Sequence, residues 1–255
     1  MLLTADVGNT EIVLGVFDGP ELRHTWRSST RPERTSDELA LLLSGFLEHR
    51  EIDLRTDITG LCIASVVPDV TSQFREMASA YLKHEPVIVG PGMKTGVSVL
   101  TDNPREVGAD RVVNTLAAFT MFGGPAVVVD FGTSTNFDVV SDKGEFLGGA
   151  LAPGVEISID ALAARGARLF KVELARPRSV IGKSTSEALQ SGLLYGFVGQ
   201  VDGMVRRITA ELGGRAVVVA TGGLAPLILD ESETLVHHEP DLTLVGLRLV
   251  HERNT

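Results

Sequence analysis

A pattern that occurs once in each half of the chain restricts the possible folds more than any other feature. The segment LLTADVGNTEIVLGVFDGPEL begins at Leu2, and the segment AVVVDFGTSTNFDVVSDKGEF begins at Ala126. They align without a gap at an offset of 124 residues (126 − 2), about half of the 255-residue chain. Each copy predicts a strand, a turn of the form Asp-x-Gly, a second strand, a turn and a third strand. This spacing predicts two similar lobes rather than a solenoid.

The gapless alignment matches polar, glycine and apolar positions of the two copies. Chance similarity between two hairpins is the competing explanation, because Gly and Asp favour turns in any protein. A carboxylate at the end of a buried strand, however, is costly unless it faces a polar site. One such carboxylate in each lobe would suit a cation site between the lobes. The matched pairs are Asp6 with Asp130, Gly8 with Gly132, Asn9 with Thr133, Thr10 with Ser134, Val16 with Val140, Asp18 with Asp142 and Glu21 with Glu145.

Glycines in and near these turns point to a nucleotide. A glycine two residues after the aspartate has no Cβ, so the backbone can approach a ligand closely. The N–H groups and hydroxyls of the turn can then cradle phosphate oxygens. A third glycine signal, Gly222-Gly223, follows the strand expected over residues 216–220, and its bare backbone offers a place for adenine. Gly-Gly turns are common without any ligand, so this signal gains its weight from the two Asp-x-Gly turns.

Strands and helices alternate along the rest of the chain, which predicts an α/β architecture. In one expected helix, Asn103 would be the N-cap, Pro104 suits the first position and Glu106 would complete a capping box. We expect an N-terminal lobe over residues 1–115 and a C-terminal lobe over residues 116–255. The expected strands cover residues 2–4, 12–17, 22–26, 61–67, 86–89, 126–129 and 216–220, and the expected helices cover residues 36–48, 70–82, 103–122, 156–165, 185–212 and 242–251.

The composition argues against several function classes: a formal net charge of −10 repels phosphate backbones, so nucleic-acid binding is not expected. The single cysteine, Cys62, cannot form an intramolecular disulfide, and its apolar neighbours predict a buried thiol rather than a nucleophile. The one histidine pair, His237-His238, is expected in a surface loop. Asp6 interrupts the first apolar run, and no apolar stretch reaches about 18 residues. We therefore expect neither a signal peptide nor a membrane span, but a soluble cytoplasmic protein.

The segment Val107-Gly108-Ala109-Asp110-Arg111 holds the candidate catalytic group. A glycine inside a helix costs about 1 kcal/mol relative to alanine, so Gly108 needs a reason, such as close approach of a ligand or a helix that starts here. An Asp-Arg pair is often only a surface pair without a role. The small residues before Asp110 instead leave room for a substrate. Phosphoryl transfer to an alcohol needs an acceptor for the hydroxyl proton, which Asp110 could supply while Arg111 binds an anionic group.

Ten stretches match the motifs of one protein family, in order and over nearly the whole chain. They are DVGNT from Asp6, VVPDVTS from Val66, VIVGPGMKTG from Val87, DNPREVGADRVVN from Asp102, VVDFGTST from Val128, FLGGALAPGVEIS from Phe146, RPRSVIGKST from Arg176, LQSGLLYGFVGQVDG from Leu189, ATGGLAPL from Ala220 and DLTLVGLRLVHERN from Asp241. On these motifs the chain resembles the type III pantothenate kinases. So many motifs in order are far more specific than any single glycine turn.

The resemblance implies the actin-like and sugar-kinase-like fold, with two duplicated ribonuclease-H-like lobes, mixed sheets and a cleft between them. It implies ATP-dependent phosphorylation of pantothenate to 4'-phosphopantothenate, the first step of coenzyme A biosynthesis. It also implies a homodimer, Mg²⁺ as the companion of ATP, and a monovalent cation, K⁺ or NH₄⁺.

The resemblance also assigns roles to individual residues. Asp110 would be the catalytic proton acceptor. Asp130 would bind the monovalent cation, and Asp6 would lie near Mg²⁺, in direct contact or through water. Together with the glycine turns, it gives as expected ATP contacts Asp6, Val7, Gly8, Asn9, Thr10, Gly132, Thr133, Gly222 and Gly223, and as expected pantothenate contacts Gly108, Ala109, Asp110, Arg111 and Thr185.

Two positions depart from the family pattern. Thr101 stands where many members have a tyrosine that contacts substrate, and the segment GTSTN puts Asn136 where the commoner GTATT has threonine. Two other functions stay open: a sugar or acetate kinase of the same fold, and a nucleotide-binding regulatory or accessory protein without kinase turnover. The GADR and GKST segments argue against the first, and the three intact aspartates at 6, 110 and 130 argue against the second.

Overall fold

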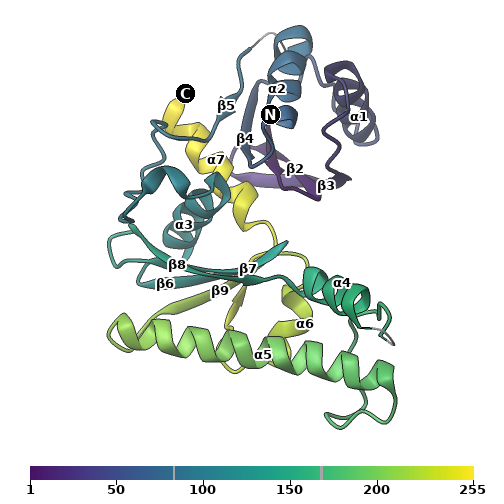
Figure 1. Ribbon diagram of the computed structural model, residues 1–255. Coiled ribbons are helices and arrows are strands. Elements are labelled where there is room, and N and C mark those ends of the chain that lie inside the picture. The colour runs from purple at the N-terminus through teal and green to yellow at the C-terminus, as the bar shows by residue number, and fades with distance from the viewer. Residues whose placement is uncertain (83, 167–168) are drawn as a thin grey trace. The chain divides into compact units, whose positions relative to one another are not determined.

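The computed structural model describes residues 1–82, 84–166 and 169–255 (Figure 1). The chain divides into two compact units. Unit 1 comprises Met1–Val97, Asp102–Ala117 and Leu242–Thr255, and unit 2 comprises Ser98–Thr101 and Ala118–Asp241. Each unit contains a mixed five-stranded sheet, which confirms the predicted α/β fold class with two similar lobes.

Unit 1 is built on a sheet with the strand order β3-β2-β1-β4-β5. The first three strands form an antiparallel meander, and β4 and β5 extend the sheet in parallel with β1. Part of α3, at its C-terminal end, belongs to unit 2. The strands are β1 (Leu2–Val7), β2 (Glu11–Asp18), β3 (Glu21–Ser29), β4 (Gly60–Ser65) and β5 (Val87–Ile88), and the helices are α1 (Ser36–Glu48), α2 (Pro68–Met77), α3 (Ala109–Phe122) and α7 (Leu242–Asn254).

Unit 2 repeats this plan with the strand order β8-β7-β6-β9-β10. Again three antiparallel strands come first, and two parallel strands follow on the other side of the central strand. The strands are β6 (Ala126–Phe131), β7 (Ser134–Val140), β8 (Phe146–Pro153), β9 (Val217–Thr221) and β10 (His237–His238), and the helices are α4 (Val155–Arg165), α5 (Thr185–Glu211) and α6 (Ala225–Leu229).

The duplication predicted from the repeat is confirmed. The central strands β1 and β6 begin and end 124 residues apart. Both meanders also carry the same register irregularity between their second and third strands. It lies at Val16/Phe17 in unit 1 and at Val139/Val140 in unit 2. The two sheets therefore share order, strand direction and local distortion.

The gapless alignment is wrong by one residue over the second strand of the repeat. Residues 8–10 connect β1 to β2, whereas only residues 132–133 connect β6 to β7. The strand aspartate consequently lies opposite Val13 in unit 1 and opposite Asn136 in unit 2. A longer turn between β7 and β8 restores the offset of 124. Leu22 of β3 pairs with Phe17, and Phe146 of β8 pairs with Val140 directly after the same register irregularity.

This correction changes which turn residues are equivalent. The sequence alignment matches Thr10 with Ser134, but the strand register matches Thr10 with Thr133. Asn9 is then the extra residue of the longer turn. Both Asp-x-Gly turns therefore end on a threonine hydroxyl directly before the next strand.

Helices cover both faces of the unit 1 sheet. Alternate β1 residues such as Leu3 and Ala5 are buried with side chains of α1 and α2. On the opposite face, Cys62 of β4 is buried with Val113 of α3 and Leu247 of α7. Strands that are buried on both faces appear in sequence as nearly continuous apolar runs, as β4 does. Burial raises the pKa of the Cys62 thiol to about 12, which agrees with the predicted buried, unreactive cysteine.

One long helix, α5, covers a face of the unit 2 sheet (Figure 1). Its buried residues Leu194, Val198, Val201 and Val205 recur at three- and four-residue spacing and form one apolar stripe. This stripe packs with alternate residues of β6 and with Phe137 of β7. Within the described ranges, no helix is both long enough and apolar enough to cross a membrane.

The expected lobes, residues 1–115 and 116–255, differ from the compact units at the C-terminal end. Helix α7 belongs to unit 1 although it follows unit 2 in the chain. Apolar packing explains this, because Leu244 and Leu247 of α7 are buried with Cys62 and Ala64 of β4. Sequence order alone could not indicate this return of the chain.

Several local expectations need correction. Helix α1 begins at Ser36, and Thr35 is its N-cap, with a capping box to Glu38. Asn103 makes no cap hydrogen bond from its side chain; a separate 3₁₀ turn spans Pro104–Glu106, and α3 begins only at Ala109. The pair His237-His238 forms the half-buried strand β10, paired with β9, rather than a surface loop.

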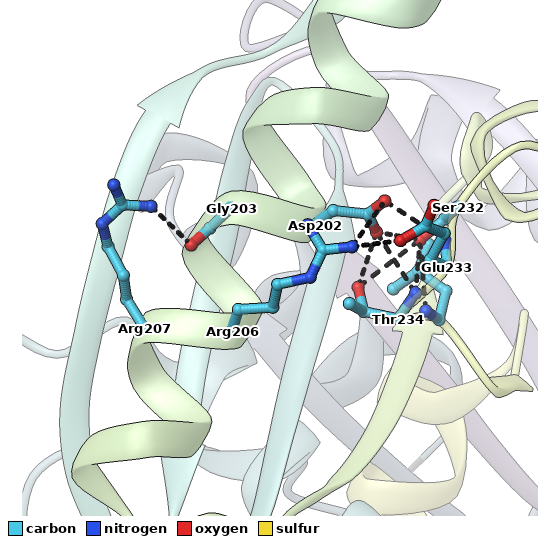
Figure 2. Close-up of polar contacts among 8 residues, drawn as sticks. Asp202, Gly203, Arg206, Arg207, Ser232, Glu233 and Thr234 are labelled. Carbon is cyan, nitrogen blue, oxygen red and sulfur yellow. Dashed lines mark hydrogen bonds and ion pairs between the residues drawn. The ribbon is translucent and has the colours of Figure 1, made fainter.

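A buried carboxylate on α5 holds the segment between α6 and β10 (Figure 2). Asp202 accepts hydrogen bonds from the hydroxyls of Ser232 (2.6 Å) and Thr234 (2.8 Å), and from the N–H groups of Glu233 and Thr234 (3.2 Å each). Burial alone raises the pKa of Asp202, but these hydrogen bonds outweigh burial and hold the pKa below its ordinary value. Asp202 is therefore a charged, satisfied structural group.

Asp202→Asn should lower the free energy of unfolding at pH 7 by about 2 kcal/mol, because the amide cannot accept all these hydrogen bonds. Since the folded pKa is depressed, the contribution of Asp202 is present above its ordinary pKa and is lost as pH falls through the folded pKa. Urea denaturation at several pH values measures both effects. The exposed Arg207→Ala is the control, expected within about 0.5 kcal/mol of wild type; a pH-independent difference for Asp202→Asn would contradict the assignment.

Candidate functional site

The Asp6 turn begins where β1 leaves the middle of its sheet. The backbone of Asp6 pairs with β2 at Val13 and with β4 at Ala64, so the residue is held near the end of a central strand. The Gly8 N–H donates to the Glu11 carbonyl at 3.0 Å, and a Cβ at Gly8 would lie 3.1 Å from that oxygen. A glycine therefore suits the tight turn predicted here.

A residue that sequence reasoning missed holds this turn from the position directly after β3. Thr30 donates its hydroxyl to the Gly8 carbonyl (2.7 Å) and its N–H to the Thr10 carbonyl (2.9 Å). Asn9 and Thr10 are exposed, so their side chains and turn N–H groups can face a ligand. The Val7 side chain is buried in the core, which leaves only its backbone for the predicted ATP contact.

The candidate base lies in the first turn of α3. Asp110 is half-buried, and its Oδ1 is fully buried without a hydrogen-bond partner among the described residues. Gly108 directly precedes α3 rather than interrupting it. Of the two explanations for this glycine, the structure supports a helix that starts at this point. A Cβ at position 108 would overlap Oδ1 of Asp110. Gly108 thus makes room for the carboxylate itself.

In unit 2, the parallel pairing of β6 with β9 brings two predicted site elements together. Asp130 lies opposite Thr221 in the register, and the next residue, Gly222, has φ +90°. A Cβ at Gly222 would lie 2.6 Å from the Phe131 carbonyl oxygen and 2.8 Å from Oδ1 of Asp130. Gly223 has open space at its Cα, so its backbone is accessible to a flat ligand.

Gly154 supports the second turn and was not predicted as a site residue. It is the N-cap of α4, and its N–H donates to the Thr133 carbonyl at 3.1 Å. A Cβ at Gly154 would overlap the carbonyl oxygens of Gly132 and Thr133. The start of α4 is therefore held against the turn that is predicted to bind phosphates. The exposed Thr133 side chain remains accessible.

The GTSTN departure from the family pattern forms a connected pair. Ser134 donates its hydroxyl to Oδ1 of Asn136 at 2.6 Å, two positions further along the same face of β7. Asn136 is buried and lies opposite Asp130 in the strand register. Both residues differ from the commoner GTATT, and each provides the hydrogen-bond partner of the other.

Thr185, the expected pantothenate contact of the GKST segment, is exposed at the first position of α5. Ser184 caps this helix and accepts a hydrogen bond from the Glu187 N–H at 3.2 Å. Glu187 in turn accepts from the Lys183 N–H (2.8 Å) and from Nε of Arg178 (2.6 Å). These hydrogen bonds hold the pKa of Glu187 below its ordinary value, and the bond from the Lys183 N–H has the largest effect. The segment is a capped turn that presents Thr185 to solvent.

The structure thus brings together some predicted site residues and leaves others separate. Asp110 and the Asp6 turn belong to unit 1, whereas Asp130, Gly222 and Thr185 belong to unit 2. The prediction that Asp6 and Asp130 face one shared cleft depends on how the units are placed, and it stays a prediction.

Metal-ligating side chains do not form a complete cage in the part of the chain that is described: no group of three or more His, Cys, Asp or Glu could hold an ion. Mg²⁺ in phosphoryl-transfer sites is usually bound by one or two carboxylates together with substrate phosphates. A strand-end carboxylate beside a turn with exposed residues, as at Asp6 and Asp130, fits this kind of donor set.

Comparisons with known proteins extend over nearly the whole chain. A family model described as type III pantothenate kinase matches residues 2–207. A type III pantothenate kinase of Frankia alni is 61% identical over 256 residues, covering 100% of both chains. Two solved structures share the fold. The activator of 2-hydroxyisocaproyl-CoA dehydratase from Clostridium difficile, with bound ADPNP, has a TM-score of 0.59 and 12% sequence identity, and the match covers 99% of this chain and 94% of that chain. The ROK hexokinase from Thermus thermophilus has a TM-score of 0.53 and 16% sequence identity, and the match covers 99% of both chains.

Gly222→Ala should lower the free energy of unfolding by about 2 kcal/mol, because φ +90° strains any side chain and the new Cβ would meet the Phe131 carbonyl. Gly223→Ala is the matched control, since nothing lies within 4 Å of its Cβ position, and it should change stability by less than about 0.5 kcal/mol. Thermal unfolding of the two variants measures the contrast. Equal melting temperatures would contradict the described backbone.

Proposed function

The chain belongs to the type III pantothenate kinase family, and we propose that it phosphorylates pantothenate with ATP, using Asp110 as the proton acceptor. The product is 4'-phosphopantothenate, in the first step of coenzyme A biosynthesis. The observation that carries the assignment of the base is the buried Oδ1 of Asp110, which has no hydrogen-bond partner within the described ranges and lies against Gly108. A carboxylate oxygen with unused lone pairs can accept a proton once its side chain turns from Gly108 toward the substrate.

In this mechanism, Asp110 takes the proton of the pantothenate hydroxyl while that oxygen attacks the γ-phosphorus in line. The P–O bond to the β,γ-bridging oxygen breaks, and ADP leaves with the bonding electrons. Gly108 leaves space for the carboxylate itself, and the small Ala109 side chain would limit crowding of the substrate beside it. Arg111 would bind an anionic group of pantothenate or of the transferred phosphoryl group. Thr185 is a further substrate contact in the proposal.

ATP would be held mainly by backbone. The exposed turn residues Asn9, Thr10 and Thr133 would offer their N–H groups, and the two threonines their equivalent hydroxyls, to phosphate oxygens. The accessible backbone at Gly223 would receive the adenine. The aspartates at the ends of the two central strands would then lie near the phosphates of a single ATP.

Two cations belong to the proposal. ATP-dependent kinases use a divalent metal, which offsets phosphate charge, and Asp6 would hold Mg²⁺ directly or through water. Asp130 would bind the monovalent cation, K⁺ or NH₄⁺. Its carboxylate lies against the backbone of Gly222, where carbonyl oxygens such as that of Phe131 could complete the ligand set.

A homodimer also forms part of the proposal. Unit 2 exposes the large apolar side chains of Leu151, Val180 and Ile181. Their transfer from water into an interface would favour association. Sedimentation equilibrium tests this assignment: a monomer at micromolar concentration would exclude it.

Asp110→Asn should lower kcat by about 10³-fold, because the amide has the shape of the carboxylate but cannot take the proton. The dissociation constant for ATP, measured by calorimetry without pantothenate, should stay within about twofold. ADP release, followed with and without pantothenate, gives the rate and also separates a pantothenate kinase from a sugar or acetate kinase. Near-native turnover of this variant would reject the base, and pantothenate-independent ATP hydrolysis would reject the substrate.

Replacing K⁺ by tetramethylammonium at constant ionic strength should lower the rate of the wild-type protein about tenfold, because the large ion cannot approach a carboxylate and phosphates closely. Asp130→Asn should be slow in both salts and should have lost this difference. A rate series in the two salts, at saturating ATP and pantothenate, measures it. A wild-type rate that is equal in both salts would contradict the monovalent cation site.

A further inference from the structure

Two complementary buried groups lie one turn apart on α3. Nδ2 of Asn114 is a hydrogen-bond donor without a partner among the described residues, and Oδ1 of Asp110 is an acceptor in the same condition. Asn114 is fully buried. A buried amide N–H without a partner costs about 1–3 kcal/mol, so its presence in the interior requires an explanation.

Helix geometry places the amide beside the turn that carries the carboxylate. Residues four apart on a helix are neighbours on the same face, with Cβ atoms about 5–6 Å apart. Because each Cα–Cβ bond tilts toward the helix N-terminus, Asn114 leans over the turn that contains Asp110. Asp110 is in the first turn of α3 and Asn114 in the second.

A residue of α7 fixes which way the amide faces. Thr243 donates its hydroxyl to Oδ1 of Asn114 at 2.8 Å, although the two residues are 129 positions apart. With Oδ1 bonded to Thr243, the NH₂ group is the part of the amide left for a different partner. Thr243 therefore keeps the donor end of Asn114 available for another group.

We propose that Asn114 is a positioning residue for the candidate base. When the Asp110 carboxylate turns from Gly108 toward the substrate hydroxyl, Nδ2 of Asn114 donates a hydrogen bond to one carboxylate oxygen. The other oxygen then has its lone pairs directed at the substrate proton. The chain Thr243–Asn114–Asp110 holds the base in its productive rotamer, a contribution to orientation rather than to binding. The inference rests on the proposed role of Asp110.

The test compares four variants in the full-length protein. Asn114→Leu removes the donor at nearly constant volume and should lower kcat about tenfold, while the KM values for ATP and pantothenate stay within about twofold. Thr243→Val removes only the group that orients the amide and should lower kcat about threefold. Thr243→Ser retains the hydroxyl and should restore the wild-type kcat. Asn254→Leu removes another amide of unit 1, bonded to the Lys94 carbonyl, and should leave kcat unchanged.

A double-mutant cycle separates positioning from general destabilisation. If Asn114 acts through Asp110, the tenfold loss should disappear when Asn114→Leu is combined with Asp110→Asn. The same tenfold loss in both backgrounds would overturn the inference, as would full activity of Asn114→Leu. If Asn114→Leu does not fold, the contrast between Thr243→Val and Thr243→Ser decides: equal kcat values reject the inference. Near-native kcat of Asp110→Asn alone would reject the proposed base as well, so the two failures are distinguishable.

Discussion

The double pairing of the central strand in each unit is the constraint on which the rest of the structure depends. β1 and β6 each have an antiparallel neighbour on one side and a parallel neighbour on the other. Both backbone edges are therefore used, and only the strand end and its side chain remain for a ligand. Because parallel strands end at the same edge of a sheet, the polar ends of β4 and β9 lie beside these aspartates. The same edge becomes polar in both units.

The sequence predicted this repeated plan because its signals are local. Apolar runs broken by Asp-x-Gly turns define the meander, and β6 begins and ends 124 residues after β1, as the repeat predicts. The one-residue slip over β7 could not be predicted, because a shorter first turn and a longer second turn cancel in the sequence. Only strand register reveals that Thr133 is the counterpart of Thr10.

The site was predictable to the extent that its residues depend on their chain neighbours. Gly108 is such a case: one residue two positions away, Asp110, explains why no side chain fits there. Thr30 and Gly154 hold the two turns from distant strand and helix ends, so no local pattern indicated them. Neither local sequence patterns nor the contacts within each unit determine how one unit is placed against the other, so the shared cleft stays a prediction.

Hydrogen bonding distinguishes two carboxylates of this chain, Asp202 and Asp110. Asp202 is almost fully buried, yet its oxygens accept four hydrogen bonds, so its charge holds two segments together and is unsuited to proton transfer. Asp110 is less buried but has a buried oxygen without a partner in the described part of the chain. An unmet acceptor or donor costs about 1–3 kcal/mol, which a fold sustains where chemistry uses the group. By this criterion Asn114 belongs with Asp110, and Asp202 belongs to the architecture.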